Sequence, residues 1–463
     1  MPRATMVTVE IERLSLEGDG VATHAGRELR VPQVLPGERV SVRLQTGKDG
    51  LRGEVVEVLL ASPHRVVPRC RHFGPCGGCA WQHVEYGEQL RLKQQLLQEA
   101  LDEALGTRAP RVSPAVRSPA SSPGATPWEY RNKASFTFAP AEGPGPLVMG
   151  HYRRGSRRVL PVVECPVHAG PANRLAFALR DALRAARIPG ATPDAAAGIA
   201  RHVVLRVAER TGEWLATLVV TENVKQLRRA TARFLAAASR EDRPGGFHLS
   251  VHDRDDPFLF GRETRRLDGL AEIREQVAGA TFLLQPDAFF QTNVRVAGEM
   301  VARVMAALPA PGFPRVLDLY SGAGLFALPL AAAGATVTAV EENRGAVASA
   351  EAARRLNRLP AARLALVAGR VEETLARLTP GPHLRYDAVV LDPPRPGCPP
   401  VVLDWIAGRL HPRRIAYVSC NPSALARDLG AALAGGFRAV EVIPFDMFPH
   451  TAHIESIAIL DRS

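Results

Sequence analysis

The sequence predicts an α/β protein with three parts, and three observations support this fold class. A chain of 463 residues is longer than a domain with a single hydrophobic core usually is, so its length favours about three domains. Short alternating strands fill the first 60 residues, three cysteines then share one loop, and from about residue 314 apolar strands alternate with helical stretches. We therefore expect domains over residues 1–60, 61–280 and 281–463.

Residues 1–60 are predicted to form a small N-terminal β-barrel. Four stretches alternate apolar and polar residues, with glycine or proline turns between them. They are VTVEIERL, RELRVPQV, GERVSVRLQ and RGEVVEVLL. Closely spaced strands of this kind favour a small barrel, an architecture that often binds RNA.

The central part, 61–280, is predicted to be an α+β domain with a cysteine cluster. A helix is expected over 85–106, and its leucine-rich face is available to pack on the C-terminal domain. Residues 106–127 are rich in Pro, Ser, Thr and Gly and predict a surface loop or linker. Two helices, over 171–187 and 223–240, are expected among strands. The strands are RNKASFTFAP, PLVMGHYRRG, RHVVLRVAER, EWLATLVVTEN and FHLSVHD.

The C-terminal part, 281–463, is predicted to contain a mainly parallel, doubly wound sheet. Its apolar strands are separated by helical stretches, as buried parallel strands joined by crossover helices require. The strands are RVLDLYSG, ATVTAVEEN, YDAVVLDPP, RIAYVSCNP and IESIAIL.

The chain is basic, with 58 Lys and Arg against 47 Asp and Glu and a net charge of +11. This balance fits a polyanionic partner, although an Arg-rich composition also produces it. The run RRGSRR at 153–158 is either an RNA contact or a solvated face. Neither a membrane-spanning apolar run nor a signal-peptide pattern is present in the sequence, so we expect a cytoplasmic protein.

A candidate nucleoside pocket follows from VLDLYSGAGLFALPLA at 316–331. A buried strand ends in Asp318, and Gly322 and Gly324 let the following turn approach a ligand before a helix opens. One strand later, Glu341 stands where a carboxylate can accept both ribose hydroxyls. The spacing departs from the Gly-x-Gly-x-x-Gly phosphate motif, which favours S-adenosylmethionine over a dinucleotide. A tight turn without a ligand is the alternative.

Three further residues carry candidate chemistry. Asp392 leaves a strand in VVLDPPRPG, where prolines stiffen a loop at the carboxyl edge of the sheet. Cys420 stands between a strand and a helix that begins near Pro422, and unpaired helix amides favour a thiolate there. Glu455 lies by the final apolar strand, where apolar surroundings suit a general base. Taken singly, each residue is also compatible with a loop, core or strand-edge role.

Four cysteines form a candidate metal site. Cys70, Cys76 and Cys79 share one loop, and Cys165 lies further along the chain. In a cytosolic protein such a cluster indicates metal binding rather than disulfides. Four thiolates suit tetrahedral zinc and an iron–sulfur cluster equally well, and zinc is the commoner structural metal.

Together these motifs resemble the uracil-5 RNA methyltransferases over nearly the whole chain. The motifs, in order, are PDAFFQTN, DLYSGAGLFALPLA, AVEEN, LDPPRPG, SCNPSALARD and PHTAHIES. The resemblance implies a Rossmann-like C-terminal domain that binds S-adenosylmethionine and methylates carbon 5 of a uridine in RNA. It also implies that Cys420 is the nucleophile and Glu455 the base. The implied cofactor contacts are Gln291, Tyr320, Glu341 and Asp392.

The resemblance favours the branch that acts on 23S ribosomal RNA, whose members carry a TRAM barrel and a [4Fe–4S] cluster. GDGVATHAGRELRVPQVLPGERV is TRAM-like, and the resemblance implies that the four cysteines named above hold the cluster. We expect RNA as partner, with 23S rRNA favoured over transfer RNA, no membrane, and a monomer. Two positions depart from the family. Leu325 stands where members can have a polar side chain, and AGR at 368–370 offers the adenine no acid or amide.

Two other classes of protein are the alternatives. A metal-stabilised RNA-binding or ribosome-assembly factor without catalysis would lack Cys420, Glu455 or the Asp318 turn, and the sequence has all three. A cysteine hydrolase would need an upstream His–Asn pair, which is not evident in the sequence, and would leave the nucleoside pocket without a purpose.

Overall fold

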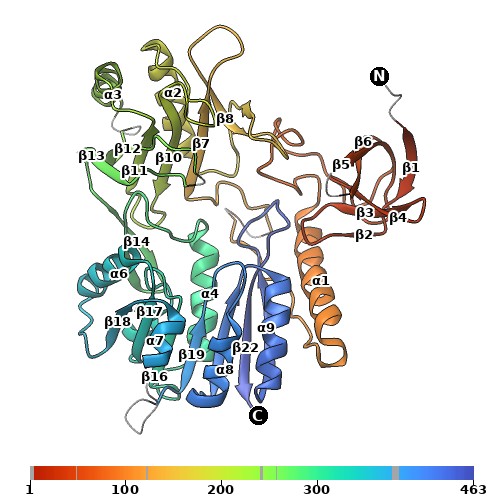
Figure 1. Cartoon of the computed structure of the whole chain (residues 1–463), viewed down its shortest axis with the longest axis vertical. Helices are drawn as coiled ribbons and strands as arrows, with labels where there is room; N and C mark the ends of the chain where they lie inside the picture. Colours follow the sequence, from red (N-terminus) through yellow and green to blue (C-terminus); the bar gives the residue numbers. More distant parts are fainter. Residues whose placement is uncertain are drawn as a thin grey trace. The chain divides into compact units, whose positions relative to one another are not determined.

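A computed structural model gives the fold of the chain (Figure 1). It describes residues 5–463 except for 48–49, 121, 123, 240–242, 257 and 378–384. The chain forms two compact units. Unit 1 comprises Met1–Ser118, Pro393–His411 and Ile415–Ser463, and unit 2 comprises Pro119–Asp392 and Pro412–Arg414.

The N-terminal sheet of unit 1 has six strands in the order β1-β5-β6-β4-β3-β2. These strands are β1 (Met6–Glu10), β2 (Arg13–Leu14), β3 (Gly20–His24), β4 (Arg27–Val31), β5 (Arg39–Gly47) and β6 (Gly50–Leu60). Alternate residues such as Leu29 and Val31, or Val40 and Val42, point into one apolar cluster. All four predicted stretches carry strands, and β3 is a strand that the sequence pattern missed.

Helix α1 (Tyr86–Leu105) packs against α9 (Pro422–Ala434) within unit 1. The predicted leucine stripe lies on its buried face. The buried leucines of the stripe are Leu92, Leu96, Leu97, Leu101 and Leu105. Apolar periodicity therefore predicted both the helix and the side that it buries.

The segment after α1 is bonded to a strand of the C-terminal sheet. Val112 and Val116 form parallel bridges with Val442 and Phe445 of strand β21 (Phe437–Phe445). Val112 is buried, and the Val116 amide donates to the Pro444 carbonyl. The stretch is a loop, as the sequence predicted, but its bonds to β21 were not predicted because the backbone groups of an edge strand accept a segment of almost any composition.

A buried ion pair joins α1 to the end of β21. Lys93 and Asp446 are fully buried, and the Lys93 ammonium donates to Asp446 over 2.5 Å and to the Phe448 carbonyl over 3.1 Å. The Tyr86 hydroxyl donates to the second Asp446 oxygen over 2.7 Å. Burial lowers the pKa of Lys93, whereas the charges of Asp446 and Glu455 raise it.

The central sheet of unit 2 has seven strands in the order β13-β12-β11-β10-β7-β8-β9. Helices α2 and α3 share an apolar core with it, through residues such as Phe136, Leu175 and Phe234 (Figure 1). The predicted strands and both helices are present, and the expected last residue of the second helix, Arg240, lies outside the described residues. The bounds are β7 (Lys133–Ala139), β8 (Val148–Tyr152), β9 (Val159–Pro161), α2 (Gly170–Ala185), β10 (Ala200–Val207), β11 (Trp214–Val220), α3 (Lys225–Ala237), β12 (Gly246–Val251) and β13 (Glu263–Gly269).

The C-terminal sheet has the strand order β18-β17-β16-β19-β20-β22-β21. In unit 2, β16 pairs in parallel with both β17 and β19, and β17 pairs in parallel with β18. In unit 1, β21 and β22 are antiparallel. The bounds are β16 (Arg315–Leu319), β17 (Thr336–Glu341), β18 (Leu364–Ala368), β19 (Ala388–Leu391), β20 (Arg414–Ser419) and β22 (Glu455–Arg462). The predicted α/β fold class is confirmed.

The remaining elements connect or flank these strands. They are the hairpin β14 (Ile273–Val277) and β15 (Ala280–Leu284), the helices α4 (Val294–Ala307), α5 (Ala327–Ala332), α6 (Arg344–Leu356), α7 (Val371–Arg377) and α8 (Pro400–Trp405), and the short helices η1 (Gly106–Arg108) and η2 (Ile406–Leu410). The sheet order reverses at β16, which lies between β17 and β19, and ligands bind beyond the carboxyl ends of strands at such a point. Across the part of the chain that the structure describes, no helix has the length and apolar character needed to cross a membrane.

The ion pair predicts how a single substitution destabilises unit 1. Lys93→Met should cost about 3–5 kcal/mol of stability, because it leaves the Asp446 carboxylate buried without its cation. Thermal unfolding followed by circular dichroism should show a clearly lower midpoint. Lys225→Met, at an exposed lysine, is the control and should leave the midpoint unchanged. Lys93→Met/Asp446→Leu should recover most of the loss, and a double variant as unstable as the single one would contradict this account.

Candidate functional site

The turn after β16 is shaped for close approach of a ligand. Asp318 lies in β16 and is fully buried. Tyr320, Gly322 and Gly324 all have positive φ angles, of 62°, 54° and 85°. Three residues with left-handed backbone conformation within five positions make a tight turn. Two of them are glycines, which adopt this conformation without steric cost. The predicted glycine turn is therefore present in the structure.

Glu341, the last residue of β17, is bound to this turn. Its carboxylate accepts a hydrogen bond from the Gly322 amide over 2.9 Å and from the Asn343 amide over 2.7 Å. Asn343 in turn caps α6, because its side chain accepts from the Ala346 amide over 3.0 Å. The two amides fix the orientation of the carboxylate and leave lone pairs on both oxygens for donors from a ligand.

Three carboxylates of unit 2, those of Asp318, Glu341 and Asp392, interact at the sheet edge, and the pKa values of Asp318 and Asp392 are raised there. Loss of solvation, followed by the charge of Glu341, raises the pKa of Asp392 to about 7. Burial, followed by the charge of Asp392, raises the pKa of Asp318 well above its ordinary value. Among the described residues no donor forms a hydrogen bond of good geometry with either Asp318 oxygen, and the Ala327 amide is the nearby backbone group that lowers the pKa of this carboxyl. A buried carboxylate with so little compensation fits a ligand that carries hydrogen-bond donors or positive charge.

The other predicted cofactor contacts lie in the same unit. Gln291 precedes α4, and its carbonyl accepts from the Asn132 side chain over 3.3 Å. Leu325 is buried and apolar, so it offers a ligand only main-chain hydrogen bonds. The Gly369 amide donates to the Glu341 carbonyl over 2.9 Å, which places the 368–370 loop beside the end of β17.

In unit 1, Cys420 follows β20 and directly precedes the cap of α9. The Asn421 side chain accepts from the amides of Ser423 and Ala424, so the helix begins where the sequence predicted it. Asn421 also donates to the Arg395 carbonyl over 3.0 Å. The cap residue therefore connects the loop of Cys420 to the proline-rich loop that follows Asp392 in the sequence.

Glu455 begins β22 and is buried with 7% exposure. The next residue, Ser456, donates from its hydroxyl to the carbonyl of Ser419, the residue before Cys420, over 3.1 Å. This bond brings the start of β22 to the end of β20. The two residues with predicted catalytic roles thus flank a single hydrogen bond at one end of the sheet.

The loop before Glu455 is held from several sides within unit 1. His450 has a φ of 67°, and its amide donates to the Gln89 side chain over 2.8 Å. Its carbonyl accepts from the amides of Ala80 and Trp81 over 3.0 and 2.8 Å. Arg395 approaches the ring of His453 at 3.3 Å. The segment that follows the cysteine loop is therefore bonded to the loop that carries Glu455.

The predicted metal ligands lie on two segments. Cys70, Cys76 and Cys79 lie between β6 and α1 in unit 1, where the Cys76 amide donates to the His72 carbonyl. Cys165 follows β9 in unit 2, and its amide donates to the Asn173 side chain over 3.1 Å. All four cysteines are partly exposed thiols.

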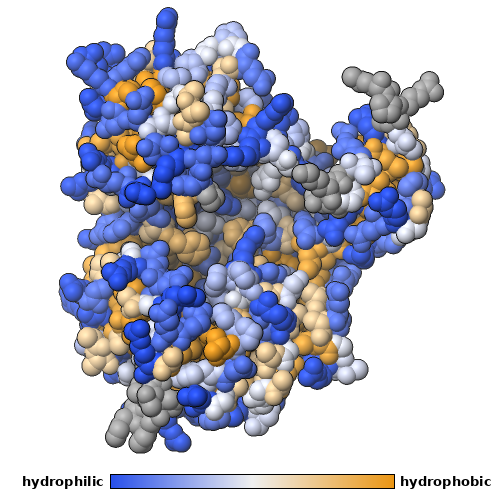
Figure 2. All heavy atoms as spheres, in the orientation of Figure 1, coloured by the Kyte–Doolittle hydropathy of each residue, from blue (hydrophilic) through white to orange (hydrophobic). Residues whose placement is uncertain are grey.

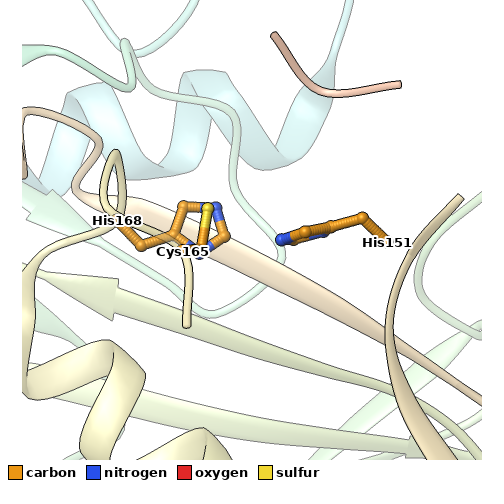
Figure 3. A group of neighbouring side chains, drawn as sticks. All are labelled: His151, Cys165 and His168. Atoms are coloured by element: carbon orange, nitrogen blue, oxygen red, sulfur yellow. The ribbon is translucent and has the colours of Figure 1, made fainter. Parts of the chain in front are cut away.

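Two histidines that the sequence analysis missed lie beside Cys165. One ligand atom from each of His151, Cys165 and His168 lies within 4.8 Å of the others (Figure 3). Burial, followed by the charge of His151, holds the pKa of His168 well below its usual range, so this imidazole is neutral and can accept a metal. His168 could have been found from its Cys-x2-His spacing, whereas His151 is adjacent only through folding of β8.

Comparisons with known proteins agree with this geometry. The family model of the tRNA (uracil-5-)-methyltransferases matches residues 268–463. An uncharacterized RNA methyltransferase of Gloeobacter violaceus is 37% identical over 462 residues, with 99% of this chain and 96% of that protein covered. Another, from Halalkalibacterium halodurans, is 32% identical over 458 residues, with 98% and 97% covered.

A solved structure is similar along the whole chain. The tRNA (uracil-54, C5)-methyltransferase of Pyrococcus abyssi, in complex with S-adenosyl-L-homocysteine, has a TM-score of 0.76 and 25% sequence identity. The match covers 98% of this chain and 99% of that one. With the 37% identical relative and the matched family model, it shows that this chain belongs to the uracil-5 RNA methyltransferase family.

Proposed function

We propose that this protein transfers a methyl group from S-adenosylmethionine to carbon 5 of a uridine in 23S ribosomal RNA. The observation that carries the proposal is the placement of Cys420 and Glu455 on either side of the Ser456–Ser419 hydrogen bond. The TRAM-like sequence and the four cysteines support the ribosomal branch. Transfer RNA is the second candidate, because the similar Pyrococcus abyssi enzyme is named for uracil 54 of tRNA.

The cofactor would be held by the residues at the carboxyl edge of β16, β17 and β19. The positive sulfonium group and the hydroxyls of S-adenosylmethionine suit the buried Asp318 carboxylate and the oriented Glu341 carboxylate. When bound, the cofactor supplies an electrophilic methyl group. The proposed contacts are Gln291, Asp318, Tyr320, Gly322, Gly324, Glu341 and Asp392.

Cys420 would activate the uracil, because carbon 5 alone is too weak a nucleophile. Its thiolate would bond to carbon 6, and the π electrons of the C5–C6 bond would move through carbon 4 onto the carbonyl oxygen. Carbon 5 of this enolate would then displace the methyl group from the sulfonium sulfur, which leaves as a neutral thioether. Glu455 next removes the proton from carbon 5, the C5–C6 double bond re-forms, and the thiolate leaves. The base must be unstacked for both faces to be reached, which requires a flipped or single-stranded uridine.

We further propose a [4Fe–4S] cluster on Cys70, Cys76, Cys79 and Cys165, with a structural role. Four thiolates saturate the iron atoms of such a cluster and leave no open position for chemistry. The group of His151, Cys165 and His168 offers a second donor set, whose nitrogen and sulfur atoms suit zinc. The two metal assignments share Cys165, so they are distinguished by substituting the ligands that belong to only one of them.

We also propose a functional division of the chain into the three parts predicted from sequence. Residues 1–60 would be an RNA-binding barrel, 61–280 the part that holds the metal, and 281–463 the catalytic part. The hydrogen bonds between the Ala80–Trp81 segment and His450 would then support catalysis from outside the catalytic part.

The substrate is tested by mapping methylated uridines in a strain that lacks this gene. Loss of 5-methyluridine at a position in 23S rRNA, restored by the wild-type gene, is the expected result. Loss from transfer RNA alone would replace the ribosomal assignment with the second candidate. No change in either RNA would contradict the proposed activity.

The different roles proposed for Cys420 and Glu455 predict that their variants stop the reaction at different steps. Cys420→Ala should bind cofactor and RNA but form no covalent adduct and transfer no methyl group. Glu455→Gln cannot accept the proton, so methylated RNA should stay attached through Cys420. Denaturing electrophoresis with labelled methyl donor should show this RNA–protein band. The double variant is the control and should lose the band, whereas wild-type turnover by Glu455→Gln would exclude this residue as the base.

The metal assignment predicts iron in anaerobically purified protein, at about four atoms per chain with matching sulfide. Cys70→Ser should remove the metal, whereas His168→Ala should retain it, as measured by elemental analysis and absorption spectra. Cys398→Ala, at a buried cysteine outside both donor sets, controls for nonspecific loss. Stoichiometric zinc that is lost in His168→Ala but kept in Cys70→Ser would instead assign the metal to the histidine-containing set.

A further inference from the structure

Unit 2 contains a cavity of about 570 Å³ that the proposed methyl transfer does not use. It lies at the sheet formed by β7, β8 and β10, where Thr137 pairs with His202 across the two strands β7 and β10. Its volume falls in the range of about 300–1,000 Å³ that small-molecule sites occupy. The neighbouring residue Phe136 packs into the core under α2 and α3, so Thr137 and His202 belong to the opposite face of the sheet.

Two exposed aromatic side chains line this cavity. Tyr152, at the end of β8, is 41% exposed, and Phe258, on the loop after β12, is 68% exposed. Large exposed rings leave apolar surface in contact with water, which a binding partner can cover. An open sheet face with aromatic side chains is also a surface on which unpaired RNA bases stack.

The rim of the cavity is fixed by hydrogen bonds. Arg157 donates to the Asp255 carboxylate over 3.0 Å and to the Pro193 carbonyl over 3.1 Å, so it ties three loops together. The Phe258 amide donates to the Asp256 carboxylate over 3.1 Å, which orients the loop that presents the ring. Arg157 thus has structural partners, although its side chain is 65% exposed.

His202 supplies a partly buried imidazole to the lining of the cavity. Its Nδ1 atom has no hydrogen-bond partner among the described residues. Burial, followed by the charge of Arg201, lowers the pKa of His202 to about 4, so the imidazole is neutral near pH 7. A neutral imidazole can donate at one nitrogen and accept at the other, which suits the edge of a nucleobase.

The charges in and around the cavity favour a base inside it and phosphates outside it. Its lining contains two guanidinium groups and the carboxylates of Asp255 and Asp256, so these charges balance and the cavity has no excess of cations for a phosphate. Arg153 and Arg158, on the turn after β8, are exposed outside the cavity. These cations suit the adjoining phosphates of the same strand.

We propose that this cavity binds one unpaired base of the RNA substrate, away from the uridine that is methylated. The proposal rests on RNA being the substrate of the enzyme. Tyr152 and Phe258 stack on the base, His202 contacts its edge, and Arg153 and Arg158 contact the flanking phosphates. The pocket thereby gives the enzyme a second point of recognition along the RNA strand.

The test compares variants in steady-state methylation of a substrate RNA and in RNA binding. Phe258→Ala and Tyr152→Ala should each raise the KM for RNA on the order of 10-fold, the effect of removing one base-stacking ring. The kcat and the KM for S-adenosylmethionine should stay unchanged. Leu267→Ala, at an exposed apolar residue of β13 outside the cavity, is the matched control and should resemble the wild type.

The salt dependence of RNA binding distinguishes base stacking by the aromatic residues from phosphate contacts by the arginines. Phe258→Ala should weaken RNA binding without altering the slope of log affinity against log salt, whereas Arg153→Ala/Arg158→Ala should flatten that slope. RNA that carries a photoreactive base should also cross-link to the peptide containing Phe258. Wild-type KM values for RNA in both aromatic variants, together with cross-links only elsewhere, would overturn the pocket while leaving the methyltransferase proposal intact. An inactive wild-type protein would instead refute the proposed function itself.

Discussion

The buried contact between Lys93 and Asp446 is the constraint on which the arrangement of unit 1 depends. It ties α1, which follows the cysteine loop, to the residue after β21, and the two partners are 353 positions apart in the sequence. Tyr86 donates to the same carboxylate and accepts from the Ser118 amide, so the segment after α1 is bound at the same point. A lysine and an aspartate without solvent tolerate little displacement, because each leaves the other unpaired when it moves.

From this anchor, local hydrogen bonds set the catalytic candidates in place. Asp446 directly follows Phe445, which is paired with Glu455 in the antiparallel register of β21 and β22. Gln89, one turn before Lys93 on α1, accepts from the amide of His450. Helix α1 therefore holds the first half of the loop that leads into Glu455, at Asp446, Phe448 and His450. A helix that lies outside the predicted catalytic part thus positions a residue inside it.

Features that depend on residues adjacent in the sequence could be predicted from the sequence. The glycine turn after Asp318 and the helix start after Cys420 are of this kind, because local backbone geometry and capping decide them. The convergence of His151 with Cys165, and the pairing of Val112 with Val442, could not be predicted, because only the folded chain brings such residues together. The fold class was predictable because apolar periodicity is repeated over many elements, so one misjudged segment does not alter it.

The segment that lies along β21 has a consequence for association between molecules. β21 is the last strand in the order of the C-terminal sheet, and an uncovered last strand offers its backbone groups to a second chain. Here the amides of Ser113 and Val116 occupy carbonyls of Val442 and Pro444. A proline-rich stretch with the composition of a linker therefore protects the sheet against edge-to-edge aggregation, and it does so with backbone bonds that constrain its sequence very little.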